Sequence, residues 1–262
     1  MTETDVFRHS TPALYHRYMG PLLFEPYAKY VAERLVVLRP NRILETAAGT
    51  GIVTRAVNRV VPKAQIVATD VNPAVVEFAS QHLRSEQVTF QRADAQHLPF
   101  EDESFDLVLC VFGVMFFPDK IRANAEARRV LHIGSQYVLV TFDRLDRNPI
   151  PEAAGGAVAS VFRENPRYME RGPFSYTDAA LVERDLRAAG FEDIKVDTVQ
   201  LTSRVTAPEA AQGIVLGSPF RAEIERLDPS ALERALTAVT EALLPWDSKD
   251  VTMSAHIATA TR

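Results

Sequence analysis

Length, composition and charge limit the classes of protein to which this chain of 262 residues can belong. Hydrophobic residues make up 47% of it and charged residues 24%, as is ordinary for a globular protein. The formal net charge is −5, and no cluster of Lys and Arg offers the positive surface that nucleic-acid phosphates require. No apolar run approaches the roughly 20 residues of a membrane span, and no secretory signal opens the chain. We therefore expect a soluble, cytoplasmic protein that binds neither nucleic acid nor membrane.

The N-terminal residues, 1–39, predict a helical cap. Thr11-Pro12 is typical of an N-cap residue followed by proline at the first helical position, and Gly20-Pro21 predicts a break. Beyond the break, one helical face collects the side chains of Phe24, Tyr27, Ala28, Val31 and Leu35. Pro40 predicts the end of that helix.

Residues 40–145 alternate between short apolar runs and segments with helical periodicity. Five runs predict strands: Arg42 to Glu45, Gln65 to Thr69, Val88 to Gln91, Phe105 to Val111 and Tyr137 to Phe142. Strict alternation predicts a parallel sheet with helices on both faces. Because ligands of such sheets bind outside the carboxyl ends of the strands, we expect a cofactor-binding core here.

The C-terminal half predicts an insertion followed by the completion of the sheet. Residues 148–176 contain several Pro and Gly residues and only a weak helical pattern, which indicates a lid insertion. Residues 177–262 predict a helix capped by Thr177 and ended by Gly190, a long strand from Ile194 to Val205, two or three helices, and a last strand from Val251. The whole chain is thus expected to form a single α/β domain.

A small-residue loop with Gly49 and Gly51 follows the first strand and precedes a helix. Glycine lets the backbone approach a ligand closely, and the helix N-terminus offers free N–H groups. A dinucleotide-binding loop has Gly or Ala three residues after its second glycine, where Thr54 stands here. Glu45 would also repel a pyrophosphate. The charge therefore favours a ligand that carries an ammonium and a sulfonium group in place of phosphates.

Two further carboxylates follow the second and third strands. Asp70 lies where adenosyl and dinucleotide ligands alike place a carboxylate for their ribose hydroxyls, so it does not discriminate between them. Asp94 is placed to accept a hydrogen bond from an adenine amine, although an Asp at a strand end often only caps a turn. Together with Glu45, these residues fit a cationic adenosyl ligand better than they fit two phosphates.

Five motifs, in this order and spacing, resemble class I S-adenosylmethionine-dependent methyltransferases. They are Glu45-x-x-x-Gly49-Thr50-Gly51, Asp70-Val-Asn72, Ala93-Asp94-Ala95 with Leu98-Pro-Phe100, Phe105-Asp-Leu-Val-Leu-Cys110 and Arg129-Val-Leu131. The set is most similar to the ubiquinone/menaquinone-biosynthesis branch and covers roughly residues 40–145. The resemblance implies a Rossmann-like, doubly wound, mostly parallel seven-stranded sheet with N-terminal helices and a helical lid insertion.

The same resemblance implies S-adenosylmethionine as the cofactor. The methionine part would be held by Glu45, Thr46, Ala47, Gly49, Thr50 and Gly51. The ribose and adenine would be held by Asp70, Val71, Asn72, Asp94 and Ala95. Two further residues would cover the ligand, Val111 and Phe112. Ala47-Ala48 stand where many members of the family have Gly, which is tolerable if that position needs no positive φ.

No motif identifies a catalytic residue. His16, His97 and Tyr18 are weak candidates for a base, and no Asp-His or Lys constellation appears at a strand end. The six histidines show no metal-ligand spacing, so no metal site is expected. The candidates for an acceptor pocket are Tyr15, Tyr18, Met115, Phe116, Phe174 and Tyr176. Core packing explains each of these side chains separately.

The sequence thus predicts methyl transfer from S-adenosylmethionine to a small, partly apolar acceptor by in-line displacement, with positioning as the protein's main contribution. Two alternatives stay open. One is a nicotinamide-dependent oxidoreductase on a similar sheet, against which Glu45 and Thr54 argue. The other is a non-catalytic cofactor-binding protein on the same scaffold. No motif names the acceptor atom or the oligomeric state.

Overall fold

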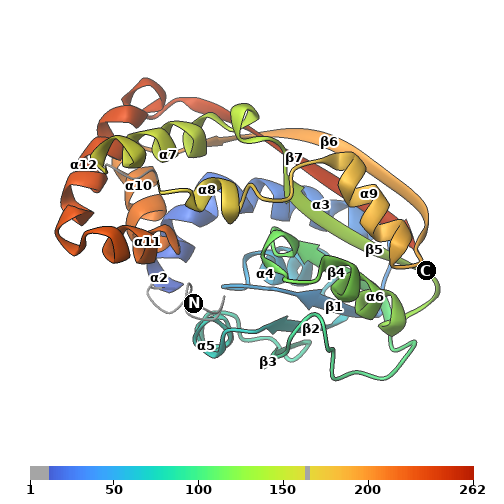
Figure 1. Cartoon of the computed structure of the whole chain (residues 1–262). Helices are drawn as coiled ribbons and strands as arrows, with labels where there is room; N and C mark the ends of the chain where they lie inside the picture. The colour runs from blue at the N-terminus through green and yellow to red at the C-terminus, as the bar shows by residue number, and fades with distance from the viewer. Residues whose placement is uncertain (1–11, 163–165) are drawn as a thin grey trace. The chain divides into compact units, whose positions relative to one another are not determined.

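A computed structural model describes residues 12–162 and 166–262, which form two compact units (Figure 1). The sheet unit comprises Tyr27–Asp143, Tyr176–Val199 and Ala255–Arg262, and the helical unit comprises the described residues of 1–26, 144–175 and 200–254. Thr11, the expected N-cap residue, lies outside the described residues. None of the helices in the described part of the chain is both long and apolar enough to span a membrane.

The described chain forms a seven-stranded sheet in the order β3-β2-β1-β4-β5-β7-β6. The strands are β1 (Arg42–Thr46), β2 (Gln65–Asp70), β3 (Val88–Arg92), β4 (Phe105–Val111), β5 (Leu131–Phe142), β6 (Glu192–Arg204) and β7 (Asp250–Thr261). Strands β1 to β5 pair in parallel, whereas β7 runs antiparallel to β5 and lies between β5 and β6. This order confirms the expected Rossmann-like, mostly parallel sheet.

The strand register brings the carboxyl ends of the parallel strands to one edge of the sheet. Glu45 of β1 lies beside Leu109 of β4, and Asp70 of β2 lies beside Arg92 of β3. The central strand β4 is buried along nearly its whole length. Its continuous apolar run is typical of a strand that is covered on both faces.

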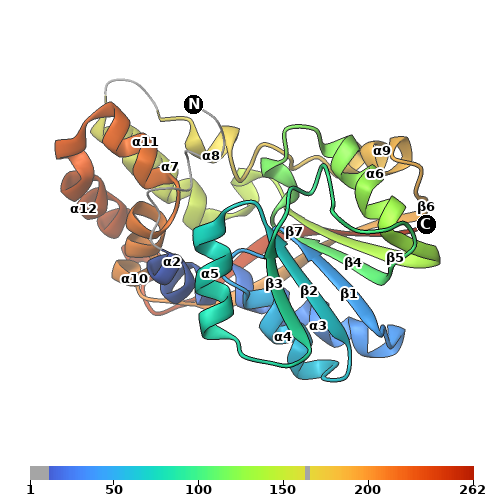
Figure 2. The same cartoon turned by 90° about the horizontal axis from the view of Figure 1, so that it is seen from below.

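Helices cover both faces of the sheet unit. They are α3 (Glu25–Leu38), α4 (Ile52–Val60), α5 (Pro73–His82), α6 (Lys120–Val130) and α9 (Ala179–Ala188), with a short 3₁₀ turn, η2 (Val114–Phe116), after β4. Figure 2 shows α6 and α9 together on one face and α3 and α4 on the other. Asn72 caps α5, because its side chain accepts a hydrogen bond from the Ala74 N–H at 3.0 Å.

Two local predictions about helix ends have different outcomes. Gly190 follows α9 with a φ of +92°, as expected of a residue that ends a helix. The predicted N-cap of α9 is wrong, because Asp178 and not Thr177 accepts a hydrogen bond from the Ala180 N–H, at 2.9 Å. The carboxylate of Asp178 lies one residue nearer to the free N–H groups of the helix, and it is the stronger cap.

The predicted break at Gly20-Pro21 is also wrong. The helix α2 (Pro12–Leu14) continues through a π-helical segment, η1 (Tyr15–Phe24), into α3. The Glu25 N–H donates to the Gly20 carbonyl, which is five residues earlier. Proline lacks an N–H group and clashes with the carbonyl four residues before it in an α-helix, and the wider π-helical turn relieves both conflicts.

The helical unit is built around helix-to-helix packing. Besides α2 and η1, its elements are η3 (Leu145–Arg147), α7 (Pro149–Val161), α8 (Tyr168–Arg171), α10 (Ala207–Gln212), π-helical η4 (Gly213–Gly217), α11 (Phe220–Leu227), η5 (Pro229–Ala231), α12 (Leu232–Leu243) and η6 (Leu244–Trp246). Helix α7 packs against α12, and Val158, Ala235 and Val239 are fully buried. The weak helical pattern expected in residues 148–176 thus corresponds to a regular helix with Gly155 and Gly156 inside it.

Candidate functional site

The loop between β1 and α4 contains three residues in the left-handed region of backbone space. Ala47, Gly49 and Gly51 have φ values of +53°, +55° and +77°. Gly51 is the N-cap of α4 and makes no side-chain capping bond. Since the first N–H groups of a helix have no partner within it, this end of α4 offers donors and a partial positive charge to a bound ligand.

Ala47 adopts a positive φ, so the condition under which alanine would be tolerated at this position without strain is not met. A residue with a side chain in this region carries a strain of order 1–3 kcal/mol. Gly113, directly after Phe112, makes room for the methyl group, because a Cβ built at position 113 would lie only 2.4 Å from the Ala47 Cβ. The two residues therefore fix the glycine loop against the end of β4.

Glu45 is a buried carboxyl group at the carboxyl end of β1, with 1% of the residue exposed. Its Oε2 accepts a hydrogen bond from the Thr54 hydroxyl at 2.6 Å. Burial raises the pKa of Glu45 from 4.5 to about 8 and outweighs the lowering effect of Thr54, while the charge of Asp70 raises it further. The sequence marked Thr54 only as a departure from a dinucleotide loop, whereas the structure makes it the partner that orients Glu45.

Asp70 connects the carboxyl end of β2 to the glycine loop. Its Oδ2 accepts a hydrogen bond from the Gly49 N–H at 3.0 Å, and its Oδ1 accepts one from the Asn72 N–H at 2.9 Å. Burial raises the pKa of Asp70, and these backbone hydrogen bonds oppose the shift. Each carboxylate oxygen has two lone pairs, so both retain acceptor capacity for a ligand hydroxyl.

Asp94 stabilises the turn that follows β3. Its Oδ1 accepts hydrogen bonds from the Gln96 N–H at 2.9 Å and from the Gln96 Nε2 at 3.2 Å. Its Oδ2 lies 3.7 Å from His97 Nδ1, and the side chain is 46% exposed. The turn-capping reading of Asp94 therefore holds in this structure, and the exposed carboxylate still has acceptor capacity for a ligand amine.

The other predicted cofactor residues differ in their exposure to solvent. Thr46, Thr50, Ala95 and Val111 are buried, whereas Val71 is 43% exposed. Phe112 has a φ of +56°. Its ring stacks on Phe142 at 4.3 Å between centroids and meets Tyr27 edge-on at 5.3 Å. The Phe112 ring thus belongs to the core of the sheet unit.

The predicted acceptor residues are divided between the two units. Tyr15, Tyr18 and Phe174 belong to the helical unit, and Met115, Phe116 and Tyr176 belong to the sheet unit. In the helical unit, Tyr15 stacks on Phe24 with 5.3 Å between centroids. In the sheet unit, the Tyr176 hydroxyl donates to Asp185 Oδ2 at 3.0 Å. Met115, Phe174 and Tyr176 are buried, whereas Tyr15, Tyr18 and Phe116 are partly exposed.

An Asp-His pair that the sequence gave no sign of lies at the end of β5. His256 Nε2 lies 3.4 Å from Asp143 Oδ1, although the two residues are far apart in the sequence. The ring also contacts the Thr177 carbonyl through Nε2 at 3.0 Å and the Thr198 hydroxyl through Nδ1 at 2.9 Å. Both ring nitrogens have partners in the interior, so the geometry is that of an anchoring residue. Only the antiparallel pairing of β7 with β5 brings these residues together.

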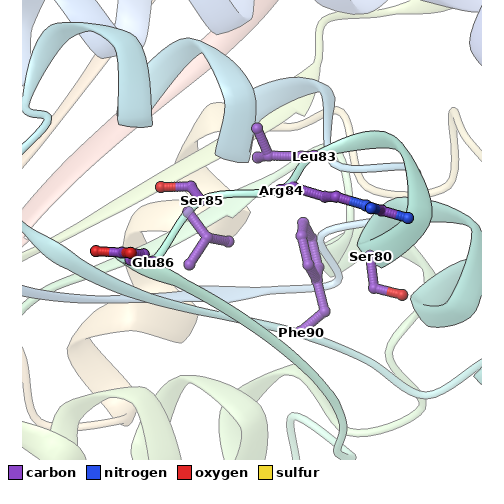
Figure 3. Close-up of a pocket in the computed structure, with 7 residues that line it drawn as sticks. Ser80, Leu83, Arg84, Ser85, Glu86 and Phe90 are labelled. Carbon is purple, nitrogen blue, oxygen red and sulfur yellow. The ribbon is translucent and has the colours of Figure 1, made fainter.

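A surface cavity of about 460 Å³ lies at the other end of the sheet unit (Figure 3). It is lined by the end of α5, the turn after it and the first half of β3, including Leu83, Arg84 and Phe90. The cofactor candidates lie instead at the carboxyl ends of the strands. Among the described residues, no three His, Cys, Asp or Glu side chains come together as metal ligands.

Comparison with known proteins relates the segment that contains these residues to a family. Residues 44–139 match the model of a methyltransferase domain. A demethylmenaquinone methyltransferase of Deinococcus radiodurans is 36% identical over 126 residues, which cover 47% of this chain and 49% of that protein. The ubiquinone/menaquinone biosynthesis C-methyltransferase UbiE of Idiomarina loihiensis is 27% identical over 198 residues, which cover 69% and 77%. Among solved structures, the [4+2]-cyclase SpnF has a TM-score of 0.60 at 23% identity, over 92% of this chain and 82% of that one.

The strand order and the matched segment define a class I S-adenosylmethionine-dependent methyltransferase domain. Residues 44–139 of this chain belong to that family, and the UbiE and demethylmenaquinone methyltransferases are distant relatives of the chain. The expected family and cofactor are thereby confirmed. The chain spans about half the length of the Deinococcus protein, so the acceptor of that relative is not assigned to this chain.

Proposed function

We propose that this protein transfers a methyl group from S-adenosylmethionine to a small, partly apolar acceptor by in-line displacement. The observation that carries the proposal is the buried carboxyl of Glu45 beside a loop with three left-handed residues, inside the segment that matches the family. A buried carboxylate favours a cationic ligand over a phosphate. The chemistry of the donor and acceptor groups therefore fits the cofactor.

Three groups of the chain would hold the cofactor in this proposal. Glu45 would accept hydrogen bonds from the ammonium of the methionine part, which favours the ionised carboxylate. The N–H groups at the start of α4 would bind the carboxylate of the same part. Asp70 would accept hydrogen bonds from the ribose hydroxyls, and its bonds to Gly49 and Asn72 hold it in place.

The bound cofactor supplies an electrophilic methyl group on a positively charged sulfur, which leaves as a neutral thioether. The protein's contribution is then to align the acceptor with the methyl group, and well-oriented reactants can gain roughly 7–11 kcal/mol in this way. We further propose that residues 148–176, with α7 and α8, act as a lid over the acceptor. Tyr15, Tyr18, Met115, Phe116, Phe174 and Tyr176 remain candidates for acceptor contacts.

Two measurements test the proposal in sequence. Calorimetry with S-adenosylmethionine and S-adenosylhomocysteine should show saturable binding to the wild type and weaker binding to Glu45→Gln. Transfer of a labelled methyl group is then measured on a panel of small acceptors. The panel includes demethylmenaquinone, because one relative is named for that substrate and another for ubiquinone/menaquinone biosynthesis. Absence of cofactor binding would sink the proposal.

A competing hypothesis is that the chain binds the cofactor without transferring a methyl group. One solved structure that shares this fold, SpnF, is described as a cyclase and not as a methyltransferase. The fold alone therefore does not dictate methyl transfer. If the cofactor binds and no acceptor in the panel or in a native extract is labelled, this hypothesis replaces ours. A fluorescence titration with NADH tests the nicotinamide alternative, against which the Glu45–Thr54 pair argues.

A further inference from the structure

The segment of residues 94–100 follows β3, the strand at one edge of the sheet (Figure 2). Its start lies beside the residues assigned to the cofactor, because the Ala93 N–H donates to the Asp70 carbonyl at 3.1 Å. Asp94 is the next residue, and its side chain is 46% exposed. An exposed carboxylate at a sheet edge has several rotamers, so its direction depends on the groups that bind it.

We propose that Gln96 is a positioning residue for the adenine part of the cofactor, because it fixes the Asp94 carboxylate against α6. The proposal rests on the function proposed above and deepens it, since it concerns how the base is selected. Gln96 lies between the two parts of a family motif, Ala93-Asp94-Ala95 and Leu98-Pro-Phe100, and belongs to neither. The sequence therefore did not single it out.

Gln96 binds the Asp94 carboxylate with two donors. Its backbone N–H and its Nε2 donate to Asp94 Oδ1 at 2.9 and 3.2 Å. The contacts of the other oxygen, Oδ2, are longer: Gln96 Nε2 lies at 3.5 Å and His97 Nδ1 at 3.7 Å. Oδ1 is thus held by short bonds, whereas Oδ2 retains the acceptor capacity that a ligand amine needs.

The other side of Gln96 binds the start of α6. Its Oε1 accepts a hydrogen bond from the Asp119 N–H at 3.0 Å, and its carbonyl accepts one from Arg122 Nε at 3.0 Å. Asp119 is the N-cap of α6, where its Oδ1 accepts from the Arg122 N–H at 2.9 Å. The Gln96 amide therefore donates to Asp94 and accepts from the helix at the same time. A side chain without both a donor and an acceptor cannot make this link.

The following turns of α6 hold the rest of the segment. Glu126 Oε2 accepts from the Leu98 N–H at 2.8 Å. Arg129 donates to the Leu98 carbonyl at 3.0 Å and to the Phe100 carbonyl at 2.7 Å. A hydrogen bond from Arg129 lowers the pKa of Glu126, so the pair stays ionised at neutral pH. The residues of α6 that bind the segment are spaced by three or four positions and share one helical face: Asp119, Arg122, Glu126 and Arg129.

This support prepares the Asp94 carboxylate before a ligand arrives. A side chain that is already fixed loses little rotamer freedom on binding, and ordering one that is free lowers affinity by about three- to tenfold. Glu45 and Asp70 are held by other bonds, from Thr54 and from the glycine loop. Loss of the Gln96 amide should therefore weaken the contact with the base and leave the contacts with the methionine and ribose parts intact.

The test compares Gln96→Met, which keeps the side-chain length and the backbone bonds, with the wild type. Gln81→Met is the matched control, because Gln81 is an exposed residue of α5 whose Nε2 also binds a carboxylate, that of Glu77, at 3.3 Å. Calorimetry measures binding of S-adenosylhomocysteine and of S-inosylhomocysteine, in which an oxygen replaces the adenine amine.

The wild type should prefer the adenosyl ligand by about tenfold or more. Gln96→Met should bind the adenosyl ligand about three- to tenfold more weakly and should not lower the affinity for the inosyl ligand by more than about twofold. Gln81→Met should change neither affinity. Unchanged binding of the adenosyl ligand in Gln96→Met would overturn the proposal.

A double-mutant cycle tests whether Gln96 acts through Asp94. In the Asp94→Ala background no carboxylate is left to position, so Gln96→Met should lower the affinity for the adenosyl ligand by less than about twofold. A role of Gln96 in folding alone would weaken both ligands equally and would persist in that background. Either of these results would refute the positioning role.

Hydrogen exchange tests the part of α6 without reference to any ligand. Arg129→Lys keeps the charge and loses the forked donor, so amides of residues 94–102 should exchange faster than in the wild type. Unchanged exchange there would overturn the support by α6.

The outcomes also separate this inference from the proposed function. If the wild type binds both ligands equally well, Asp94 does not select the base, and the inference fails while the proposed function stands. If the wild type binds neither ligand, both fail.

Discussion

Glu45 lies at the carboxyl end of β1 with 1% of the residue exposed and a hydrogen bond from Thr54. Burial raises its pKa to about 8, so the carboxyl group is protonated at neutral pH before a ligand binds. An ammonium group that approaches it favours the carboxylate and releases the proton. Cofactor binding and proton release are therefore coupled at this one residue.

The first prediction concerns the pH dependence of cofactor binding. Between pH 6 and 7.5 the affinity for S-adenosylmethionine should rise, by up to about tenfold per pH unit, because Glu45 must lose its proton. Calorimetry in buffers of different ionisation enthalpy measures the released proton. Thr54→Val removes a bond that lowers the pKa of Glu45, so its profile should move to higher pH. An affinity that is flat over this range in the wild type would contradict the coupling.

The second prediction concerns stability without ligand. Glu45 has a folded pKa of about 8 and an ordinary value of 4.5, so the folded state holds a proton that the unfolded state lacks between these values. The free energy of unfolding should then fall with rising pH across that window, by up to roughly 1.4 kcal/mol per unit. Glu45→Gln has no proton to lose. Its stability relative to the wild type, from denaturant unfolding, should therefore increase between pH 5.5 and pH 8 while its cofactor affinity falls.

At the scale of elements, the loop after β1 and the segment after β4 depend on each other through Ala47 and Gly113. The Ala47 methyl group occupies the space that a side chain at position 113 would need. A loop that carries a strained alanine is held in shape only when its surroundings leave no better conformation. Packing against the end of β4 supplies that constraint.

The third prediction follows from this contact. Gly113→Ala should lower the free energy of unfolding by about 1–3 kcal/mol, because its Cβ would lie 2.4 Å from the Ala47 Cβ. It should also weaken cofactor binding, since the loop must shift. Gly156→Ala is the control, because this position lies inside α7 and a Cβ there meets nothing within 4 Å. We expect the control to gain about 0.5–1 kcal/mol in thermal unfolding, and equal losses in both variants would refute the contact's role.

At the scale of the whole molecule, the two units contain different sets of candidate residues. The fourth prediction is that the cofactor, at about 100 times its dissociation constant, stabilises the protein by about 2.7 kcal/mol. In hydrogen exchange the largest gain in protection should lie in residues 45–54 and 70–72 of the sheet unit. Peptides from α11 and α12, within residues 220–243, should gain less. Uniform protection across both units would contradict this assignment of the cofactor.

Much of the sheet unit could be predicted from the sequence, because its signals are local. The apolar runs of β1, β2 and β4 and the period of α4 to α6 depend on neighbours a few residues away. Glu45, Gly49 and Gly51 could be recognised because a loop of fixed spacing contains them all. The continuous N-terminal helix was harder to predict from the sequence. Pro21 predicts a break in an α-helix, and the π-helical turn of η1 accommodates this proline.

The sequence by itself determined the class of fold, the family and the residues that we assign to the cofactor, because strand ends and the glycine loop are encoded in short stretches. The tertiary structure alone decided which distant residues meet. It gave Glu45 its raised pKa through burial, paired it with Thr54, and placed Ala47 against Gly113. It also brought His256 to Asp143, because β7 enters the sheet antiparallel beside β5. Contacts of this kind depend on register and burial, which no local pattern of residues contains.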